Sequence, residues 1–203
     1  MTTLVFADVH NRWREVSSII REWGEKVDRI ISLGDWLDNF GESKTDVIKT
    51  TALLNTLLKN PKFIWLLGNH DLYYVYSHNK YFRCSGNTEE KAKLFLEILG
   101  EQRFKYKLYH FDDYFLYSHA GLNPTFLPPS GFSPEWLEIR ANRARIAAES
   151  GMIDTLLCAG FSRGGSQTVG GIIWQDWDDD FVSIPGVDQV CAHTPGRFPR
   201  RIY

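Results

Sequence analysis

Five short motifs in this chain each place a metal-binding side chain at the end of an expected strand. The side chains are carboxylates, imidazoles and one carboxamide, a mixed oxygen and nitrogen set that suits manganese, iron, zinc or nickel better than calcium. We therefore expect two divalent metal ions as cofactors, with manganese the best match. The motifs are Asp8-Val9-His10, Gly34-Asp35-Trp36-Leu37-Asp38, Gly68-Asn69-His70-Asp71, Ser118-His119-Ala120 and Ala192-His193-Thr194-Pro195.

Each motif also has an ordinary structural interpretation when it is taken alone. Gly-Asp is a common turn dipeptide, Gly-Asn-His can form an ordinary turn, and an aspartate after a strand often caps the next helix. A shared metal site is the only interpretation that uses all five motifs together.

The first third of the sequence alternates strands and helices. Apolar runs at 3–7, 29–33 and 63–67 predict strands, the first of them apolar on both faces. A periodic segment at 11–24, with Asn11 as its N-cap, and another at 45–58 predict helices. The result is a βαβαβ unit. Ligands of open α/β sheets bind beyond the carboxyl ends of the strands, where Asp8, Asp35 and Asn69 fall.

The second half supplies the remaining imidazoles. Residues 104–111 and 114–118 predict an antiparallel hairpin across Asp112-Asp113, and His119 follows it. Ser133 and Pro134 open a helix that runs to about residue 150, and a glycine-rich loop occupies 160–171. Further strands are predicted at 172–174 and 187–192, and His193 follows the second of these.

Composition sets loose limits. The chain has 203 residues, 43% of them hydrophobic and 24% charged, and we expect one domain over residues 1–203. A formal net charge of −2 gives no strong nucleic-acid signal. Cys84, Cys158 and Cys191 have no paired spacing, and the N-terminal apolar run is too short for a signal or membrane segment, so we expect a cytoplasmic protein without a membrane partner.

In this order and at these intervals, the five motifs resemble the calcineurin-like metallophosphoesterase superfamily. The final His-Thr-Pro resembles the branch that contains phosphoprotein phosphatases, small bacterial and phage serine/threonine phosphatases and diadenosine tetraphosphate hydrolases. The resemblance extends from Asp8 to Pro195. It implies an α/β fold, a calcineurin-like β-sandwich of two mixed sheets flanked by helices, with a dimetal site at the carboxyl ends of the strands.

Chemistry and the resemblance assign the same roles. Asp35 bridges the two ions, Asp8 and His10 complete one site, and the other site takes Asn69, His119 and His193. A hydroxide between the metals attacks phosphorus in line. His70, beside a ligand, is the expected general acid, with Asp38 to orient it; the alternative for Asp38 is a helix cap or a solvent contact. Asp71 is expected to support the loop.

Two departures concern the substrate. The branch usually carries an arginine after the second aspartate and another after a late tryptophan, where this chain has Asn39 and Asp176. Asn69 and Arg163 are the expected substrate-binding residues, with Arg163 adding charge to a glycine-lined anion site; a flexible connector with an exposed arginine is the alternative. Other candidate cations are Arg12, Arg14, Arg140, Arg143 and Arg145, the last three more simply a solvated helix face.

The expected function is hydrolysis of phosphate monoesters, from phosphoproteins of the serine/threonine type or from small molecules. The missing arginines leave a nucleotide phosphodiesterase or dinucleoside polyphosphate hydrolase as an alternative. A catalytically silent metal-binding or scaffolding domain is a third hypothesis.

The remaining expectations concern aromatic residues, an acidic run and the end of the chain. Tyr74 and its neighbours fill the core or line a pocket wall, and Asp178-Asp179-Asp180 form an exposed acidic turn. Only 196–203 follow the last motif, which predicts a small second sheet or one completed by a partner; we expect a monomer or a homodimer.

Overall fold

The computed structural model describes residues 1–112 and 114–200. The chain forms two compact units, Met1–Lys107 and Leu108–Tyr203, which are described separately. Each unit holds one three-stranded sheet. An α/β chain with two sheets flanked by helices agrees with the expected fold class, while its organisation as a single domain stays a prediction.

The sheet of the first unit is entirely parallel. It contains β1 (Thr3–Phe6), β2 (Arg29–Ser32) and β3 (Phe63–Trp65), in that order across the sheet. Val5 pairs with Ile31, and Ile31 pairs with Ile64. The predicted βαβαβ unit is therefore confirmed. The central strand β2 is the most buried, whereas all four residues of β1 are only half-buried.

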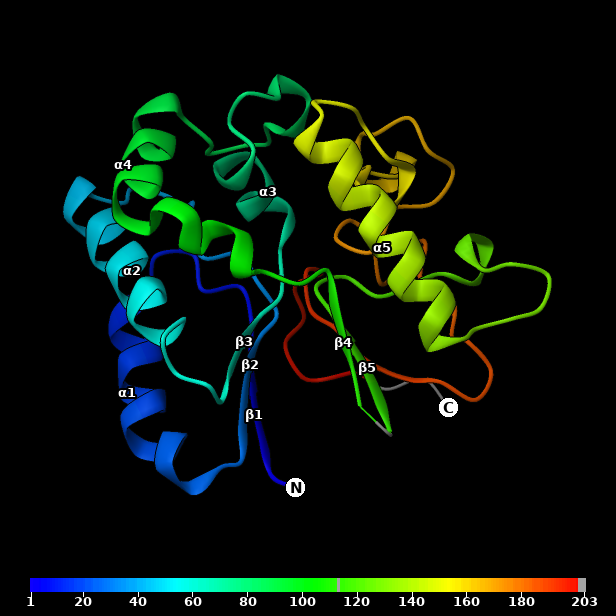
Figure 1. Ribbon diagram of the computed structural model, residues 1–203, viewed down its shortest axis with the longest axis horizontal. Coiled ribbons are helices and arrows are strands. Elements are labelled where there is room, and N and C mark those ends of the chain that lie inside the picture. The colour runs from blue at the N-terminus through cyan, green and yellow to red at the C-terminus, as the bar shows by residue number, and fades with distance from the viewer. Residues whose placement is uncertain (113, 201–203) are drawn as a thin grey trace. The chain divides into compact units, whose positions relative to one another are not determined.

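Helices α1 (Trp13–Trp23), α2 (Lys44–Leu57) and α4 (Glu89–Leu99) lie together on one side of this sheet (Figure 1). The prediction that Asn11 is the N-cap of α1 is wrong. Asn11 adopts a left-handed conformation (φ 62°), and Arg12 is the residue that directly precedes the helix. Ser43 and Asp46 form a reciprocal capping box at the start of α2. Helix α4 and the short helix α3 (Asn69–Val75) were not predicted from the sequence. Short 3₁₀ helices occupy Gly24–Lys26, Lys80–Phe82 and Gly100–Lys105.

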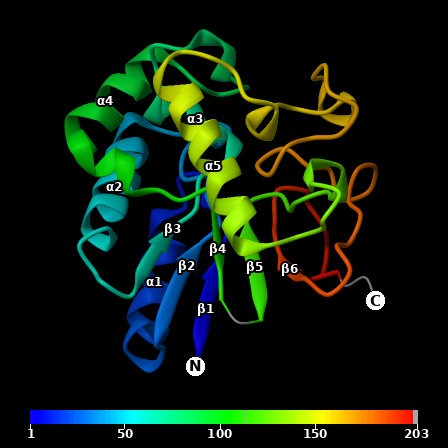
Figure 2. The ribbon, with the colours of Figure 1, turned by 45° about the vertical axis from the view of Figure 1, so that its right-hand side comes forward.

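In the second unit, β4 (Tyr109–Phe111) pairs antiparallel with β5 (Phe115–Ser118), and β6 (Asp188–Val190) pairs parallel with β5. Figure 2 shows these three strands side by side. Helix α5 (Pro134–Glu149) begins after the Ser133 cap, as predicted. Pro124–Phe126, Thr155–Leu157 and Phe161–Arg163 are 3₁₀ turns.

Of the strand predictions in the second half of the sequence, one is wrong and another is too long. Residues 172–174 form a turn, in which Trp174 N–H donates to Gly171 O at 2.8 Å, and Ile172 and Ile173 are fully buried without belonging to a sheet. The predicted antiparallel hairpin is confirmed by the pairing of β4 with β5, but its first strand was predicted to begin at 104, whereas 104–105 end a 3₁₀ helix and β4 covers 109–111. Of the predicted hairpin turn, Asp113 lies outside the described residues. Among residues 1–112 and 114–200, no helix is both long and apolar enough to cross a membrane.

Candidate active site

The first unit gathers Asp8, His10 and Asp35 at the carboxyl end of its sheet. One ligand atom from each lies within 4.8 Å of the others. His10 Nε2 is 3.9 Å from Asp8 Oδ1 and 3.8 Å from Asp35 Oδ2. A metal that binds each donor at about 2.0–2.2 Å fits between donors at this separation. The three residues therefore have both the chemistry and the spacing of a divalent metal site.

The imidazole of His10 is fixed in the orientation that a ligand needs. Its Nδ1 lies 3.0 Å from the carbonyl oxygen of Leu37, an acceptor, so Nδ1 carries the proton and donates it. Nε2, which faces the two carboxylates, then keeps its lone pair for a metal.

Several motif residues have an unusual backbone conformation, with a positive φ angle. Within the described residues, six side-chain-bearing residues have a positive φ, a region that costs energy for residues other than glycine. Such strain gathers at functional sites, where surrounding contacts enforce it. All six lie in or beside the motifs: Asp8, His10, Asn11, Asp35, Asp38 and His193.

Two glycines let the second and third motifs approach each other. A Cβ at Gly34 would lie 2.3 Å from Gly68 N, and one at Gly68 would lie 2.1 Å from Asp35 Oδ1. Asp71 locks this approach: its fully buried carboxylate accepts the backbone N–H groups of Asp35 and Trp36, both at 2.8 Å. The prediction that Asp71 supports the loop is confirmed.

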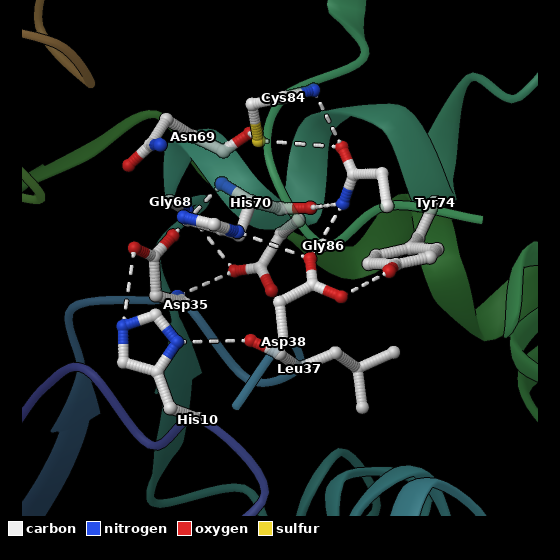
Figure 3. Close-up of polar contacts among 12 residues, drawn as sticks. His10, Asp35, Leu37, Asp38, Gly68, Asn69, His70, Tyr74, Cys84 and Gly86 are labelled. Atoms are coloured by element: carbon white, nitrogen blue, oxygen red, sulfur yellow. Dashed lines mark hydrogen bonds and ion pairs between the residues drawn. The ribbon is translucent and has the colours of Figure 1, made fainter. Parts of the chain in front are cut away.

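His70 lies beside His10 and Asp35, at the start of α3 (Figure 3). Its ring centroid is 5.2 Å from that of His10, and its backbone N–H donates to Asp35 Oδ1 at 2.9 Å. Its Nδ1 lies 3.0 Å from Asp38 Oδ2. The predicted pairing of His70 with Asp38 is thus present, and the alternative of a solvent-facing Asp38 is excluded because its side chain is 1% exposed.

Charge is stabilised within this pair. Burial opposes the charged imidazolium, but the bond to Asp38, with contributions from Cys84 and Asp35, outweighs burial and raises the pKa of His70 to about 11. Burial likewise opposes the Asp38 carboxylate, yet hydrogen bonds from His70, Lys91 and Tyr74 prevail and lower its pKa. The pair therefore holds a proton on His70 against a charged Asp38.

Asp38 is also contacted by three residues that were not predicted as site residues. Tyr74 OH lies 2.5 Å from Oδ1, Asn87 Nδ2 lies 2.6 Å from Oδ2, and Lys91 Nζ lies 2.8 Å from Oδ1. Tyr74 follows His70 by one helical turn, a spacing that could have indicated it. It is fully buried, as a core residue is. Asn87 and Lys91 lie in a segment without a motif.

In the second unit, His119 and His193 face each other. His119 Nε2 and His193 Nδ1 are 3.1 Å apart, a separation that suits two ligands of one metal. β5 ends one residue before His119, and Ala192 N–H donates to His119 O at 2.7 Å. Pairing of β5 with β6 therefore brings together two imidazoles that are 74 residues apart.

The last motif is held by the glycine-rich loop. Arg163 Nη2 contacts Thr194 Oγ1 at 2.9 Å and Asp176 Oδ2 at 2.6 Å. The charge of Arg163 is therefore balanced by Asp176, the residue that stands where the branch usually carries an arginine. Other candidate cations also have acidic partners: Arg14 with Asp46, Arg140 with Asp154, and Arg145 with Glu149.

The expected acidic turn is only partly exposed. Asp178 and Asp179 are exposed, but Asp180 is buried and accepts Ser162 Oγ at 2.9 Å and Gly170 N–H at 3.0 Å. Asp180 thus ties the glycine-rich loop to the segment that follows Trp177, because its carboxylate satisfies donors of that loop.

The chain belongs to the calcineurin-like phosphoesterase family, whose model matches residues 1–197. This family consists of metal-dependent phosphoester hydrolases, and the match spans every motif. No curated protein matches the chain.

Several solved structures resemble the chain at low identity. A cold-active protein-tyrosine phosphatase of a psychrophilic Shewanella species has a TM-score of 0.49 at 13% identity, covering 86% of this chain and 56% of that one. A metallophosphoesterase from Sphaerobacter thermophilus has a TM-score of 0.40 at 22% identity, covering 62% and 48%. A protein serine/threonine phosphatase from Saccharomyces cerevisiae has a TM-score of 0.44 at 17% identity, covering 61% and 39%. The chain spans about half the length of the first solved structures that it matches.

Proposed function

We propose that the protein hydrolyses phosphate monoesters with two divalent metal ions, manganese being the best match to the donor set. The observation that carries this proposal is the Asp8, His10 and Asp35 group, with the His70–Asp38 pair beside it. Family membership supports the reaction class. Serine/threonine phosphoproteins or small phosphorylated molecules are the proposed substrates.

Six residues are the proposed ligands. Asp8 and His10 hold one ion, Asp35 bridges, and Asn69, His119 and His193 hold the other. The His119–His193 spacing and the buried position of Asn69 beside His70 support the second set. When bound, the ions supply a Lewis acid that activates water and neutralises phosphoryl oxygens.

His70 is the proposed general acid. Asp38 engages Nδ1, which leaves Nε2 to carry the proton that the leaving oxygen receives. Asp35 and its neighbours keep the imidazole next to the ligand group through the His70 backbone N–H. Asn69 and Arg163 are the proposed phosphoryl contacts, Arg163 in its pair with Asp176.

A second candidate function is hydrolysis of phosphodiesters, such as nucleotides or dinucleoside polyphosphates. The Arg163–Asp176 pair favours it, because a guanidinium already balanced by a carboxylate grips a doubly charged monoester less strongly. Asn39, at the other position where the branch usually carries an arginine, has no charge to add. We further propose a reducing, cytoplasmic location, which the three free cysteines support.

The test is kcat/KM on a matched aryl phosphate monoester and diester, with metal-stripped protein reconstituted with manganese. Preference for the monoester supports the primary proposal, and preference for the diester supports the second. Two bound ions per chain without turnover of either ester would contradict both.

A further inference from the structure

The carboxylate of Asp38 has more partners than orientation of one histidine requires. Oδ2 accepts from His70 and Asn87, and Oδ1 accepts from Tyr74 and Lys91. Each oxygen therefore receives two donors, which fixes the carboxylate against rotation on both sides. Its position sets the position of the His70 ring, because Nδ1 is bound to it.

Lys91 brings an ammonium to this group, and all of its donors are engaged. Its three donors meet Asp38 Oδ1 at 2.8 Å, Gly86 O at 2.7 Å and Glu42 Oε1. The side chain is 16% exposed, although the helix that carries it lies at the surface of the first unit. A lysine with no donor left over does not bind substrate; it holds two carboxylates in place.

Glu42 carries this connection to the metal-ligand loops. Its Oε2 accepts Asn11 Nδ2 at 2.6 Å and also the backbone N–H of Asn39. Asn11 follows the ligand His10, and Asn39 follows Asp38. Lys91 is thus the point where the acid pair and the first two motif loops meet.

We propose that Lys91 is a positioning residue for the general acid: it holds Asp38, and through Asp38 the ring of His70, in the orientation for proton donation from Nε2. This inference rests on the proposed function. Without the ammonium, the carboxylates of Asp38 and Glu42 lose the positive charge that they share, and their repulsion moves Asp38 out of its position beside His70. A neutral side chain of similar length therefore disturbs the acid and leaves the metal ligands intact.

The test compares Lys91→Met with Lys93→Met, a control on the same helix whose side chain is 79% exposed. The substrates are aryl phosphates of graded leaving-group pKa, in the ester class that the wild-type protein hydrolyses. We expect Lys91→Met to lose about 10–100-fold in kcat on the phenyl ester, part of the contribution of a general acid. On the dinitrophenyl ester, which needs no proton, we expect little loss. KM and metal content stay unchanged, and Lys91→Arg restores most of the phenyl-ester rate.

A uniform loss across leaving groups, with lowered stability, would make Lys91 merely structural and overturn the proposal. If Lys91→Met does not fold, the Lys91→Met/Glu42→Gln double variant removes one of the two repelling carboxylates and is measured in its place. The same dependence on leaving group is expected, and its absence counts against the proposal.

A second measurement does not depend on turnover. Nitrogen-15 NMR of the His70 ring reports whether Nδ1 stays hydrogen bonded. We expect the signal of a bound Nδ1 in the wild type and Lys93→Met, and its loss in Lys91→Met. An unchanged ring signal in Lys91→Met overturns the proposal for Lys91, whereas wild-type protein that is inactive with two ions bound contradicts only the proposed function.

Discussion

The two units hold their candidate ligands in different ways. In the first unit, the ligand loops directly follow parallel strands, and their backbones stay paired beyond the sheet, with Asp8 N–H bound to Gly34 O at 3.1 Å and His10 N–H to Asp35 O at 2.9 Å. In the second unit, His119 follows β5 and His193 follows β6, and helix α5 with several 3₁₀ turns lies between these two strands. The first set therefore follows strands that are near in sequence, whereas the second set depends on the pairing of two strands that are far apart in sequence.

Each unit uses a buried aspartate to hold its loops. Asp71 follows His70 directly and binds the loop of the second motif. Asp180 instead binds Ser162 Oγ and the backbone of Gly170, residues of a loop that carries no ligand itself. In the first unit, the buried aspartate therefore binds the loop that carries a candidate metal ligand. In the second unit, it binds a loop that carries none of the candidate metal ligands.

The largest expected effect is that of Asp35→Asn. Loss of the bridging charge should strip both ions and lower kcat/KM by more than about 10³-fold, because the ions supply several kcal/mol of charge stabilisation. Elemental analysis after gel filtration gives the metal content. Asp188→Asn, an exposed residue of β6, is the control. Two ions retained in Asp35→Asn would disprove the bridge.

His70→Ala should keep the metals and lose about 10²–10⁴-fold on esters with poor leaving groups, the contribution of a general acid. Rates on activated esters should fall much less. Equal losses across leaving groups would remove His70 from the role of acid. His78→Ala, at an exposed histidine of the same unit, controls for loss of an imidazole.

His193→Ala tests whether the two ions bind independently of each other. We expect the content to fall to about one ion per chain, because Asp8, His10 and Asp35 remain, and the residual affinity to depend on pH as ligand protonation requires. Isothermal titration with manganese measures both. Loss of both ions would show that the first ion does not bind without the second.

Gly68→Ala tests the close approach of the second and third motifs. Its Cβ would lie 2.1 Å from Asp35 Oδ1, so we expect a loss of about 1–3 kcal/mol in the free energy of unfolding from overpacking. Gly24→Ala is the matched control, because its Cβ would meet Ile20 Cγ2 at an ordinary 3.5 Å. Equal stability of both variants in urea would contradict the tight contact.

The smallest effect concerns acid stability. Because folding lowers the pKa of Asp38 below its ordinary value of 3.8, its stabilising contribution is present above that pH and is lost as the pH falls through the folded pKa. Lys91→Met should lessen this loss, since it removes one cause of the lowering. Urea unfolding from pH 7 to pH 2 measures the difference, and a Lys91→Met profile with the wild-type slope would contradict it.

Much of the first unit could be predicted from the sequence. Strands β1, β2 and β3, the positions of Asp8 and Asp35 after them, and the pairing of His70 with Asp38 all follow from local pattern and motif. The prediction was wrong at 172–174, where an apolar triplet is buried by packing in a turn. Hydrophobicity indicates burial there, but it does not distinguish a strand from a turn.

The sequence by itself determined the family, the types of the candidate ligands and the pairing of His70 with Asp38, because these depend on the residue types of short motifs and on the order of those motifs. Only the tertiary structure decided what surrounds them. Asn87 and Lys91 lie 49 and 53 residues from Asp38 in the sequence, and Arg163 forms an ion pair with Asp176. These contacts join residues from different elements, and the spacing of residues within one element carries no record of them.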